Sequence, residues 1–407
     1  MRIFLSLILL GAALAQAQPL PLAAPEAVGL SPERLVRLHR TFEQLTTEGK
    51  RAGAVTMIVR DGKIADWHAY GYRDLGAKLP MEKDSIFHIW SMTKSVTSVA
   101  AMVLIEEGKL ALEDKVETYI PEFKDVQVFR GGTAGEPVLG KPSRPMTIKH
   151  LLTHTSGLQY GWEEGPIPEF YKRAKVFEAG TLKEFAGKAA HLPLAFDPGD
   201  QYQYGISIDV LGYVVEVVSG MPFDRFVKTR ILEPLKMRDT WFVVPPDQRG
   251  RLARTYTTKD GKLVEQAREK FEDTAVPFGG MGLYSTIGDY ARFAQALLNG
   301  GQLDGVRILS RKTVELMMAN HLNHMARPTT GGSDAEGFGL GGSVRIDLAK
   351  GNSLGSVGEF GWGGAASTYY RIDPKERSVV LLFMQYMPYD SATLARFSTL
   401  FYQAIAD

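Results

Sequence analysis

The sequence predicts an α+β protein in which one antiparallel sheet is built from both ends of the chain, with flanking helices and an inserted, mostly helical region. Apolar and polar residues alternate with period two near the N-terminus and again near the C-terminus, whereas the middle of the chain is poor in such alternation. At 407 residues the chain also exceeds the size at which a single core stops growing. We therefore expect a discontinuous α/β domain of residues 25–84 and 285–407, and a mostly helical domain of residues 85–284.

The N-terminal stretch has the pattern of a secretory signal peptide. Residues 1–17 combine a basic start, an apolar centre and small residues at the end, and they are too few to span a bilayer. We exclude them from the fold and expect a periplasmic or secreted protein. No later segment has the long apolar run of a membrane helix, so no membrane span is expected.

The first folded elements are a helix and a hairpin. Residues 31–49 carry apolar side chains at helical spacing behind a serine that can cap the helix. Alternating residues at 54–60 and 64–72 flank Asp61-Gly62, which is a strong signal for a two-residue turn between antiparallel strands.

The middle of the chain predicts short helices joined by long loops, and strands return only near the C-terminus. A helix is expected after Ser91, and the Gly/Pro-rich stretch 131–145 is expected to be a loop. The further expected helices are 148–153, 181–190, 207–219 and 392–405, and the expected late strands are 343–348, 367–373 and 378–385.

Composition restricts the partners. With 47 Lys and Arg against 46 Asp and Glu, the net charge of +1 offers little attraction to nucleic acid. The absence of cysteine excludes disulfides, thiolate zinc sites and a cysteine nucleophile. We expect a small, weakly charged substrate and no cofactor, and the oligomeric state is left open.

The candidate nucleophile is Ser91 in Ser91-Met92-Thr93-Lys94, where a strand-like segment gives way to a helix. Residues three apart share a helix face, so Lys94 can reach the Ser91 hydroxyl. Burial of an amine favours its neutral, basic form, and a helix N-terminus supplies N–H groups that stabilise an oxyanion. On this motif alone, a capping serine beside a solvated lysine remains the ordinary alternative.

Two further segments can complete such a site. Tyr204 follows a Pro-Gly turn and precedes a helix, so its phenol can face a cleft and relay a proton. Glycines surround Trp362 at Gly361, Gly363 and Gly364, which lets backbone approach a ligand closely. The backbone N–H of Ala365 then fits a second oxyanion donor. A packed tyrosine and a bulge with a packed tryptophan are the ordinary alternatives.

These motifs together resemble one known superfamily. The quoted serine–lysine motif, the Tyr204 segment, HLLTHTSGL (150–158), GGMGLYSTIGDYARF (279–293) and FGWGGAASTYYRIDP (360–374) are similar to those of serine β-lactamases and penicillin-binding proteins. Within that superfamily the chain looks most like the family VIII carboxylesterases, which are relatives of class C β-lactamases.

The resemblance implies a fold and a set of roles. It implies a β-lactamase/transpeptidase-like fold with Ser91 in the cleft between an α/β domain and a helical domain. It also implies that Ser91 is the nucleophile, Lys94 its base and Tyr204 the proton relay, with an oxyanion hole at the backbone N–H groups of Ser91 and Ala365.

Two departures from the β-lactamase pattern bear on the substrate. Ile206 stands where β-lactamases and peptidases have an asparagine, and Trp362-Gly363-Gly364 stands where they have a lysine or histidine followed by a hydroxyl residue and glycine. An indole offers no charge to a substrate carboxylate. We therefore expect Ile206, Trp362, Gly363 and Gly364 to contact a neutral ester.

The sequence is compatible with three functions, of which we rank one first. The expected one is a carboxylesterase that acts through an acyl-serine, with a secondary activity on β-lactams. The alternatives are a β-lactamase or D-amino-acid peptidase of the same superfamily, and a penicillin-binding receptor that is acylated without turnover.

Other motifs are interpreted as coincidental. Gly351 to Gly355 matches the G-x-S-x-G elbow, but the glycine-rich segment that follows cannot form the required helix. His154 is expected at the capped end of a short helix, in a structural role. His321 and His324 are expected on a helix without a third ligand, so we predict no metal site.

Overall fold

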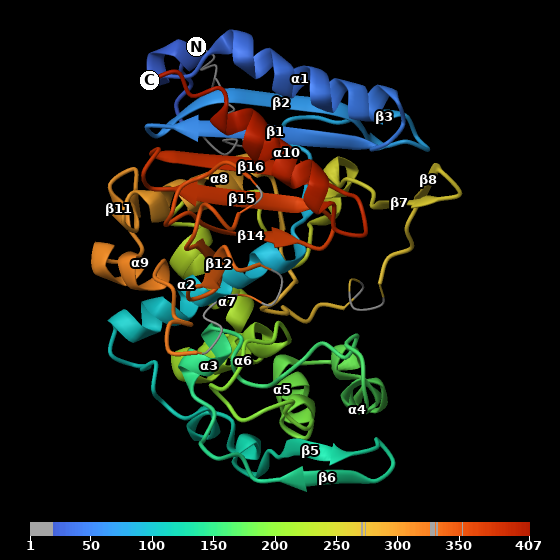
Figure 1. Ribbon diagram of the computed structural model, residues 1–407, viewed down its shortest axis with the longest axis vertical. Helices are drawn as coiled ribbons and strands as arrows, with labels where there is room; N and C mark the ends of the chain where they lie inside the picture. The colour runs from blue at the N-terminus through green and yellow to red at the C-terminus, as the bar shows by residue number, and fades with distance from the viewer. Residues whose placement is uncertain (1–18, 270–271, 273, 326–329, 331–332, 352) are drawn as a thin grey trace, which may run out of the picture.

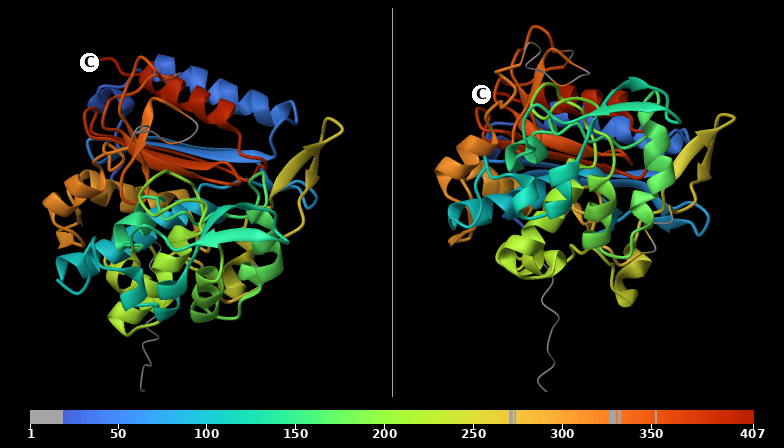
Figure 2. Two further views of the ribbon diagram at one scale, coloured as in Figure 1. Left: turned by 60° about the horizontal axis from the view of Figure 1, so that its bottom comes forward. Right: turned by 90° about the horizontal axis from the view of Figure 1, so that it is seen from below.

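The computed structural model describes residues 19–407 except 270–271, 273, 326–329, 331–332 and 352, so the expected signal peptide lies outside the described residues. An eight-stranded antiparallel sheet has the order β12-β13-β14-β15-β16-β1-β2-β3, and the helices α1 (Pro32–Thr47) and α10 (Ser391–Tyr402) lie side by side along it (Figures 1 and 2). The expected α+β fold, with strands from both ends of the chain in one sheet, is confirmed. The domain boundaries at 85 and 285 stay a prediction.

The strands of this sheet are β1 (Gly53–Arg60), β2 (Lys63–Asp74), β3 (Leu79–Pro80), β12 (Glu336–Phe338), β13 (Ser343–Arg345), β14 (Phe360–Gly364), β15 (Thr368–Asp373) and β16 (Ser378–Met384). Short two-stranded pairs are formed by β4 (Phe87–His88) with β9 (Tyr284–Ser285), β5 (Val128–Gly132) with β6 (Pro137–Gly140), β7 (Tyr256–Lys259) with β8 (Lys262–Glu265), and β10 (Gln302–Leu303) with β11 (Val306–Arg307).

The α-helices are α1 (Pro32–Thr47), α2 (Thr93–Glu106), α3 (Ile148–Leu152), α4 (Ile167–Ala174), α5 (Leu182–Ala190), α6 (Ser207–Ser219), α7 (Phe223–Val227), α8 (Ile287–Leu298), α9 (Arg311–Met317) and α10 (Ser391–Tyr402). Shorter helical turns are η1 (Pro25–Val28), η2 (Trp90–Met92), η3 (Val116–Thr118), η4 (Pro121–Asp125), η5 (Val176–Glu178), η6 (Lys228–Leu232) and η7 (Pro246–Arg251). Among the described residues, none of these helices has the length and hydropathy needed to cross a membrane.

The central strand pair explains why the sheet is covered on both faces. All eight residues of β1 are buried, and β1 pairs with β16 so that Val55 lies opposite Phe383. On one face Ala54 and Ile58 pack in a cluster with residues of α1 and α10. On the other face Val55 and Met57 belong to the main core, which includes α2 and α8. Because side chains alternate along a strand, one apolar run serves two helical layers.

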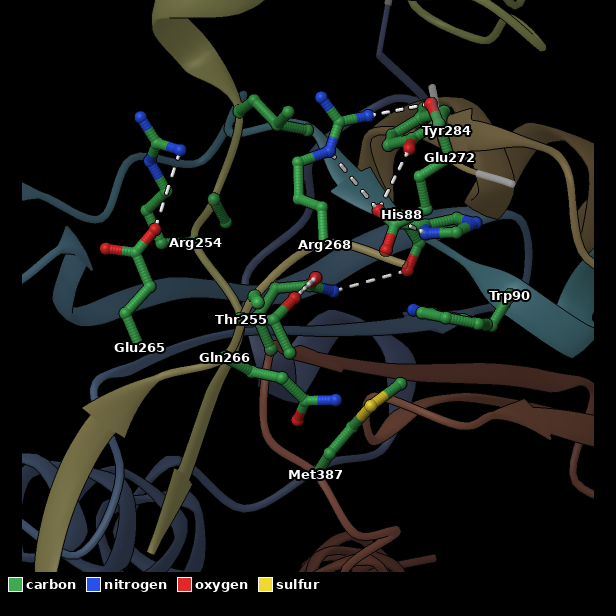
Figure 3. Close-up of a pocket in the computed structure, with 14 residues that line it drawn as sticks. His88, Trp90, Arg254, Thr255, Glu265, Gln266, Arg268, Glu272, Tyr284 and Met387 are labelled. Atoms are coloured by element: carbon green, nitrogen blue, oxygen red, sulfur yellow. Dashed lines mark hydrogen bonds and ion pairs between the residues drawn. The ribbon is translucent and has the colours of Figure 1, made fainter. Parts of the chain in front are cut away.

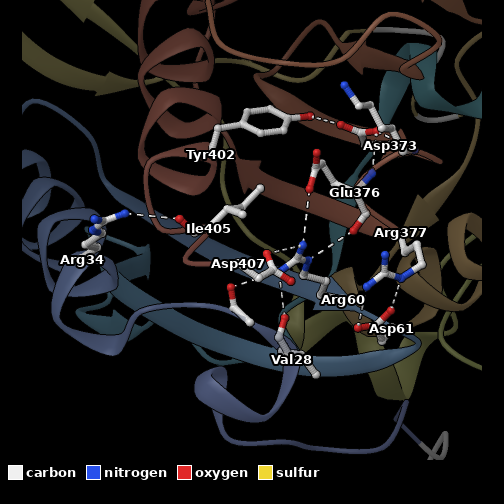
Figure 4. Close-up of polar contacts among 12 residues, drawn as sticks. Val28, Arg34, Arg60, Asp61, Asp373, Glu376, Arg377, Tyr402, Ile405 and Asp407 are labelled. Carbon is white, nitrogen blue, oxygen red and sulfur yellow. Dashed lines mark hydrogen bonds and ion pairs between the residues drawn. The ribbon is translucent and has the colours of Figure 1, made fainter.

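Buried Arg60, at the end of β1, joins the two ends of the described chain (Figure 4). Its guanidinium donates hydrogen bonds to the carbonyl oxygens of Val28 at 2.9 Å and Gly29 at 3.0 Å. The same group contacts the Asp407 carboxylate at 2.9 Å. A buried guanidinium is stable only when its N–H groups have hydrogen-bond partners. These contacts hold the first helical turn and Asp407 against the hairpin of β1 and β2.

Three sequence expectations differ from the structure. The stretch 131–145, expected as a loop, contributes to the hairpin of β5 and β6. The strands pair through their backbones, and a shift in register between Phe129 and Gly131 accommodates the glycines. Residues 360–364 form the strand β14, which the glycine content had concealed. His321 and His324 lie in a turn after α9 instead of on a helix.

Candidate active site

Ser91 lies in the helical turn η2, between strand β4 and helix α2. The preceding residue, Trp90, has a φ of 47°, a left-handed conformation that is costly for a bulky residue. The strand-like segment that the sequence indicates before Ser91 is therefore limited to the short strand Phe87–His88. It presents Ser91 partly exposed at the start of α2, whose first twelve residues are all buried.

Lys94 is buried one turn after Ser91, and its amine has three oxygen partners. The distances from Lys94 Nζ are 3.3 Å to Ser91 Oγ, 2.7 Å to Tyr160 Oη and 2.7 Å to the carbonyl oxygen of Gly280. Only 1% of the lysine is exposed. The expected approach of Lys94 to Ser91 is therefore present, and the solvated lysine of the ordinary alternative is not.

Tyr204 faces the same amine from the loop before α6. Lys94 Nζ lies 4.8 Å from the centre of the Tyr204 ring. The Tyr204 hydroxyl accepts a hydrogen bond of 3.3 Å from the indole N–H of Trp362. The structure thus brings Ser91, Lys94, Tyr204 and Trp362 into one cluster.

The end of β14 packs against the backbone that leads into Ser91. A methyl group added at Gly364 would overlap the carbonyl oxygen of Ile89 and the hydroxyl of Thr368. That hydroxyl donates to the same Ile89 oxygen at 3.3 Å. Ala365 follows and is exposed. The glycine permits the close approach that the expected pair of oxyanion donors requires.

Ile206 lies beside this cluster without being exposed to it. Its side chain is completely buried in the main core, at the start of α6. Its backbone N–H donates to the carbonyl oxygen of Gln159 at 3.2 Å. A direct contact of Ile206 with substrate is therefore not visible in this structure, and the expectation stays a prediction.

Tyr160 is the residue that sequence analysis missed. Burial, with Tyr204 and Asp209 adding to it, raises the pKa of the Tyr160 phenol well above its usual value, so the hydroxyl stays neutral beside the amine. Its ring stacks on Trp162 at 4.2 Å between ring centres, although Trp162 is 71% exposed. Tyr160 follows the HTSGL motif after Gln159, and nothing in the sequence around it indicates that its hydroxyl reaches Lys94.

Asp209 lies behind the amine as a buried carboxyl group. Its Oδ1 accepts the backbone N–H of Gly280 at 2.7 Å, and the carbonyl of the same glycine accepts from Lys94. Its Oδ2 is buried and has no hydrogen-bond partner among the described residues. Burial raises the pKa of Asp209 to about 6, and the nearby Lys94 opposes that rise.

His154 is fully buried and contacts Tyr204 rather than Ser91. The two ring centres are 4.7 Å apart, and His154 Nδ1 accepts the N–H of Gly205 at 3.3 Å. Burial, helped by Lys94, lowers the pKa of His154 well below its usual value, so the ring is neutral. It supports the loop that carries Tyr204, in line with the structural role expected for it.

The remaining motif, Gly351 to Gly355, lies on the loop between β13 and β14. Ser353 follows no strand-to-helix turn: it lies between β13 and β14, and its hydroxyl accepts a hydrogen bond of 3.1 Å from Arg345.

A small cavity of about 40 Å³ lies beside the cluster, and Trp90 forms part of its wall (Figure 3). His88 is stacked between Trp90 and Tyr284 there, with ring centres 4.2 Å and 4.4 Å away. Glu272 lies 3.4 Å from His88 Nδ1. A cavity of this size holds only a few water molecules and is too small for an ester substrate.

The fold, in which the partly exposed Ser91 lies beside the buried Lys94, is that of the serine β-lactamase and penicillin-binding-protein superfamily. The chain belongs to the Beta-lactamase family, whose model matches residues 38–402.

Relatives of known sequence or structure agree with this assignment. The chain is 36% identical to Protein Rv1367c of Mycobacterium tuberculosis, over 86% of this chain and 89% of that protein. It is 31% identical to Esterase EstB of Burkholderia gladioli, over 86% of this chain and 90% of that protein. Among solved structures it resembles EstCE1, described as a hydrolase with promiscuous acyltransferase activity, with a TM-score of 0.78, 27% identity and coverage of 92% and 99%. These comparisons support a hydrolase or acyltransferase of the β-lactamase fold.

Proposed function

We propose that the protein is a carboxylesterase that hydrolyses small neutral esters through an acyl-Ser91 intermediate. The observation that carries the proposal is the enclosure of the Lys94 amine between Ser91 Oγ at 3.3 Å, Tyr160 Oη at 2.7 Å and the Gly280 carbonyl at 2.7 Å. The similarity to Esterase EstB supports the ester class.

The three partners of Lys94 suit a neutral amine as well as an ammonium. The Gly280 carbonyl can only accept, whereas the two hydroxyls can either donate or accept. A neutral amine can therefore donate to Gly280 and Tyr160 and accept the proton of Ser91 with its lone pair. The same contacts hold the ammonium that forms when the proton is transferred, so no side chain has to move.

The proposed reaction has two balanced steps. Ser91 Oγ attacks the ester carbonyl carbon while Lys94 takes the hydroxyl proton, and that proton passes through Tyr204 to the leaving alkoxide, which departs as the alcohol. Water then attacks the acyl-Ser91 carbonyl, gives one proton to the Tyr204–Lys94 pair, and releases the carboxylic acid while Ser91 regains its proton.

Backbone donors would stabilise the tetrahedral intermediates. We assign this role to the N–H groups of Ser91 and Ala365, because Gly364 packs directly on Ile89 and brings the two segments together. Loss of one such donor typically slows a reaction by about 100-fold to 1,000-fold.

The walls of the cluster favour a neutral, apolar substrate. Trp362 already donates its indole N–H to Tyr204 and carries no charge to pair with a carboxylate. The rings of Trp162, Tyr160, Tyr204 and Trp362 form a continuous series, with adjacent centres 4.2 to 5.4 Å apart. Such a surface binds acyl and aryl groups better than anionic ones.

The test is the release of p-nitrophenol from its acetyl and butyryl esters. Ser91→Ala should abolish turnover, whereas Ser353→Ala, which changes the serine of the G-x-S-x-G match, should leave it within about twofold. Wild-type turnover by Ser91→Ala, or a loss of activity only in Ser353→Ala, would overturn the proposal.

Other acyl-serine functions are separated by substrate. Turnover of a chromogenic cephalosporin at a rate comparable with the esters would favour the β-lactamase or peptidase alternative. A stoichiometric burst without a steady state would favour a receptor. Ester formation with an added alcohol in place of water would favour the acyltransferase activity that is named for EstCE1.

A further inference from the structure

A cluster of two histidines and one aspartate lies between helix α1 and strand β2, on the sheet face that α1 and α10 cover. His39 comes from α1, and Asp66 and His68 come from β2, two residues apart and therefore on the same face of the strand. Tyr70, next on that face, packs on Phe42 of α1, with ring centres 5.5 Å apart. The Lys94 cluster belongs to the opposite face, so this site is separate from the proposed active site.

The three side chains converge on the Asp66 carboxylate. His39 Nε2 lies 2.6 Å from Asp66 Oδ2, and His68 Nδ1 lies 3.3 Å from Asp66 Oδ1. The two imidazole rings are tilted by 40° to one another, with centres 4.0 Å apart. All three potential ligand atoms lie within 4.8 Å of one another.

This donor set is that of an open transition-metal site. Two imidazole nitrogens and one carboxylate oxygen, completed by water, are the ligands of many catalytic zinc sites. Metal–ligand bonds of about 2.0–2.1 Å place tetrahedral ligands about 3.3 Å apart. The separations of 2.6 Å and 3.3 Å to the Asp66 carboxylate lie at or below that value and the three ligand atoms lie within 4.8 Å of one another, so an ion can be admitted by rotation of the side chains.

Charge and access also suit a cation. Asp66 is buried, and its carboxylate pairs with His39 and His68, not with a lysine or an arginine. Glu43, one turn after His39 on α1, adds a second negative charge nearby. The His68 side chain is 47% exposed, so an ion can enter from solvent and keep a water ligand on that side.

We propose that His39, Asp66 and His68 bind one divalent transition-metal ion of the zinc type and thereby tie α1 to β2. The sequence prediction of no metal site considered only His321 and His324, which are neighbours in the chain. The ligands found here come from two elements, and only the folded sheet brings them together. The site serves stability and is independent of the proposed esterase.

The experiment titrates the chelator-treated full chain with Zn²⁺ in a calorimeter and records thermal unfolding with and without the ion. We expect one Zn²⁺ per chain and a higher unfolding temperature, because a ligand that binds only the folded state stabilises it. Mg²⁺ should have no effect, since it prefers six oxygen ligands.

Ligand variants decide whether this cluster is the site. His68→Ala and Asp66→Asn should weaken Zn²⁺ binding by more than about tenfold, since losing even an outer-shell partner costs about 10-fold to 100-fold. His191→Ala, which removes an exposed histidine on the helical side, should bind as the wild type does. If Asp66→Asn does not fold, His68→Gln tests the most exposed ligand instead.

Two results would overturn the proposal. The first is an absence of stoichiometric Zn²⁺ binding by the wild-type chain, which would mean that the two histidines only form hydrogen bonds and ion pairs with Asp66. The second is equal binding by the wild type and by folded His68→Ala or His68→Gln, which would place the ion elsewhere.

Discussion

The Lys94 amine lies closer to the Tyr160 hydroxyl, at 2.7 Å, than to the Ser91 hydroxyl, at 3.3 Å. A second tyrosine, Tyr204, presents its ring to the same amine at 4.8 Å. The two phenols therefore have different relationships to one lysine, one through its hydroxyl and the other through its ring. Substitution can separate what each contributes.

Removing the Tyr204 hydroxyl should affect chemistry more than removing that of Tyr160. Tyr204→Phe should lower kcat on p-nitrophenyl acetate by about 100-fold or more, the usual contribution of proton transfer. Tyr160→Phe should lower it by about 10-fold to 100-fold, because one hydrogen bond to the amine is lost.

The matched control is Tyr213→Phe, a partly buried tyrosine of α6 that does not contact Lys94. Its kcat should stay within about twofold of the wild type. A kcat unchanged in Tyr204→Phe and greatly reduced in Tyr160→Phe would reverse the two proposed roles.

Trp162 should set preference among esters and not the rate of the chemistry. Because it is 71% exposed and stacks on Tyr160, Trp162→Ala should raise KM for p-nitrophenyl butyrate by about 2-fold to 10-fold, the value of one aromatic contact, with kcat preserved. Trp162→Phe should restore most of the KM. A loss confined to kcat would indicate that Trp162 acts on Lys94 through Tyr160 instead.

Asp209 should govern the acidic side of the pH profile. Its pKa is raised to about 6, so a negative charge appears behind the Lys94 amine as the pH rises through 6. Asp209→Asn keeps an acceptor for the Gly280 N–H and removes that charge. The part of the pH dependence of kcat/KM that comes from the Asp209 titration near pH 6 should therefore be absent in this variant.

Asp289→Asn is the control for charge removal alone. Burial raises the pKa of Asp289 to about 7, but its carboxylate accepts hydrogen bonds from Thr240 and from the Asp239 backbone, not from the Lys94 cluster. Its pH profile should match the wild type. An equal shift in both variants would show a general electrostatic effect, contrary to the prediction.

Gly364 should tolerate no side chain. Gly364→Ala places a methyl group against the Ile89 carbonyl and the Thr368 hydroxyl, so we expect a loss of about 1–3 kcal/mol in the free energy of unfolding and at least tenfold lower activity. Urea unfolding and the ester assay measure the two effects.

The same substitution at Gly187, inside helix α5 with open space around it, should have the opposite sign. Gly187→Ala should stabilise the chain by up to about 1 kcal/mol, because alanine favours helix and nothing is displaced. Stability of Gly364→Ala equal to that of the wild type would mean that β14 can move away from Ile89.

Elements defined by local pattern were predictable from sequence. The serine cap and apolar spacing of 31–49 correspond to α1, where Ser31 accepts the N–H of Arg34 at 3.3 Å. The Asp61-Gly62 turn also lies where expected, between β1 and β2. These features depend on neighbours in the chain, which is the information that periodicity contains.

Features that depend on distant partners were not predictable in the same way. The sequence of β14 does not predict a strand, because its glycines give no alternation of apolar and polar residues. It forms a strand by pairing with β13 and β15. Tyr160 shows no sign of its contact with Lys94, since the two are joined only by the packing of α2 against a loop. Trp90 adopts a positive φ that its residue type disfavours, so a strand was expected there.

The pairing of β1 with β16 has a consequence for biosynthesis. β1 ends at Arg60 and β16 begins only at Ser378, so the central ladder cannot close until all of the intervening chain has left the ribosome. Until then the nascent hairpin exposes one unpaired edge lined by apolar residues, the kind of surface that holdase chaperones bind. Truncation before β16 should therefore yield an aggregating product and not a smaller folded one.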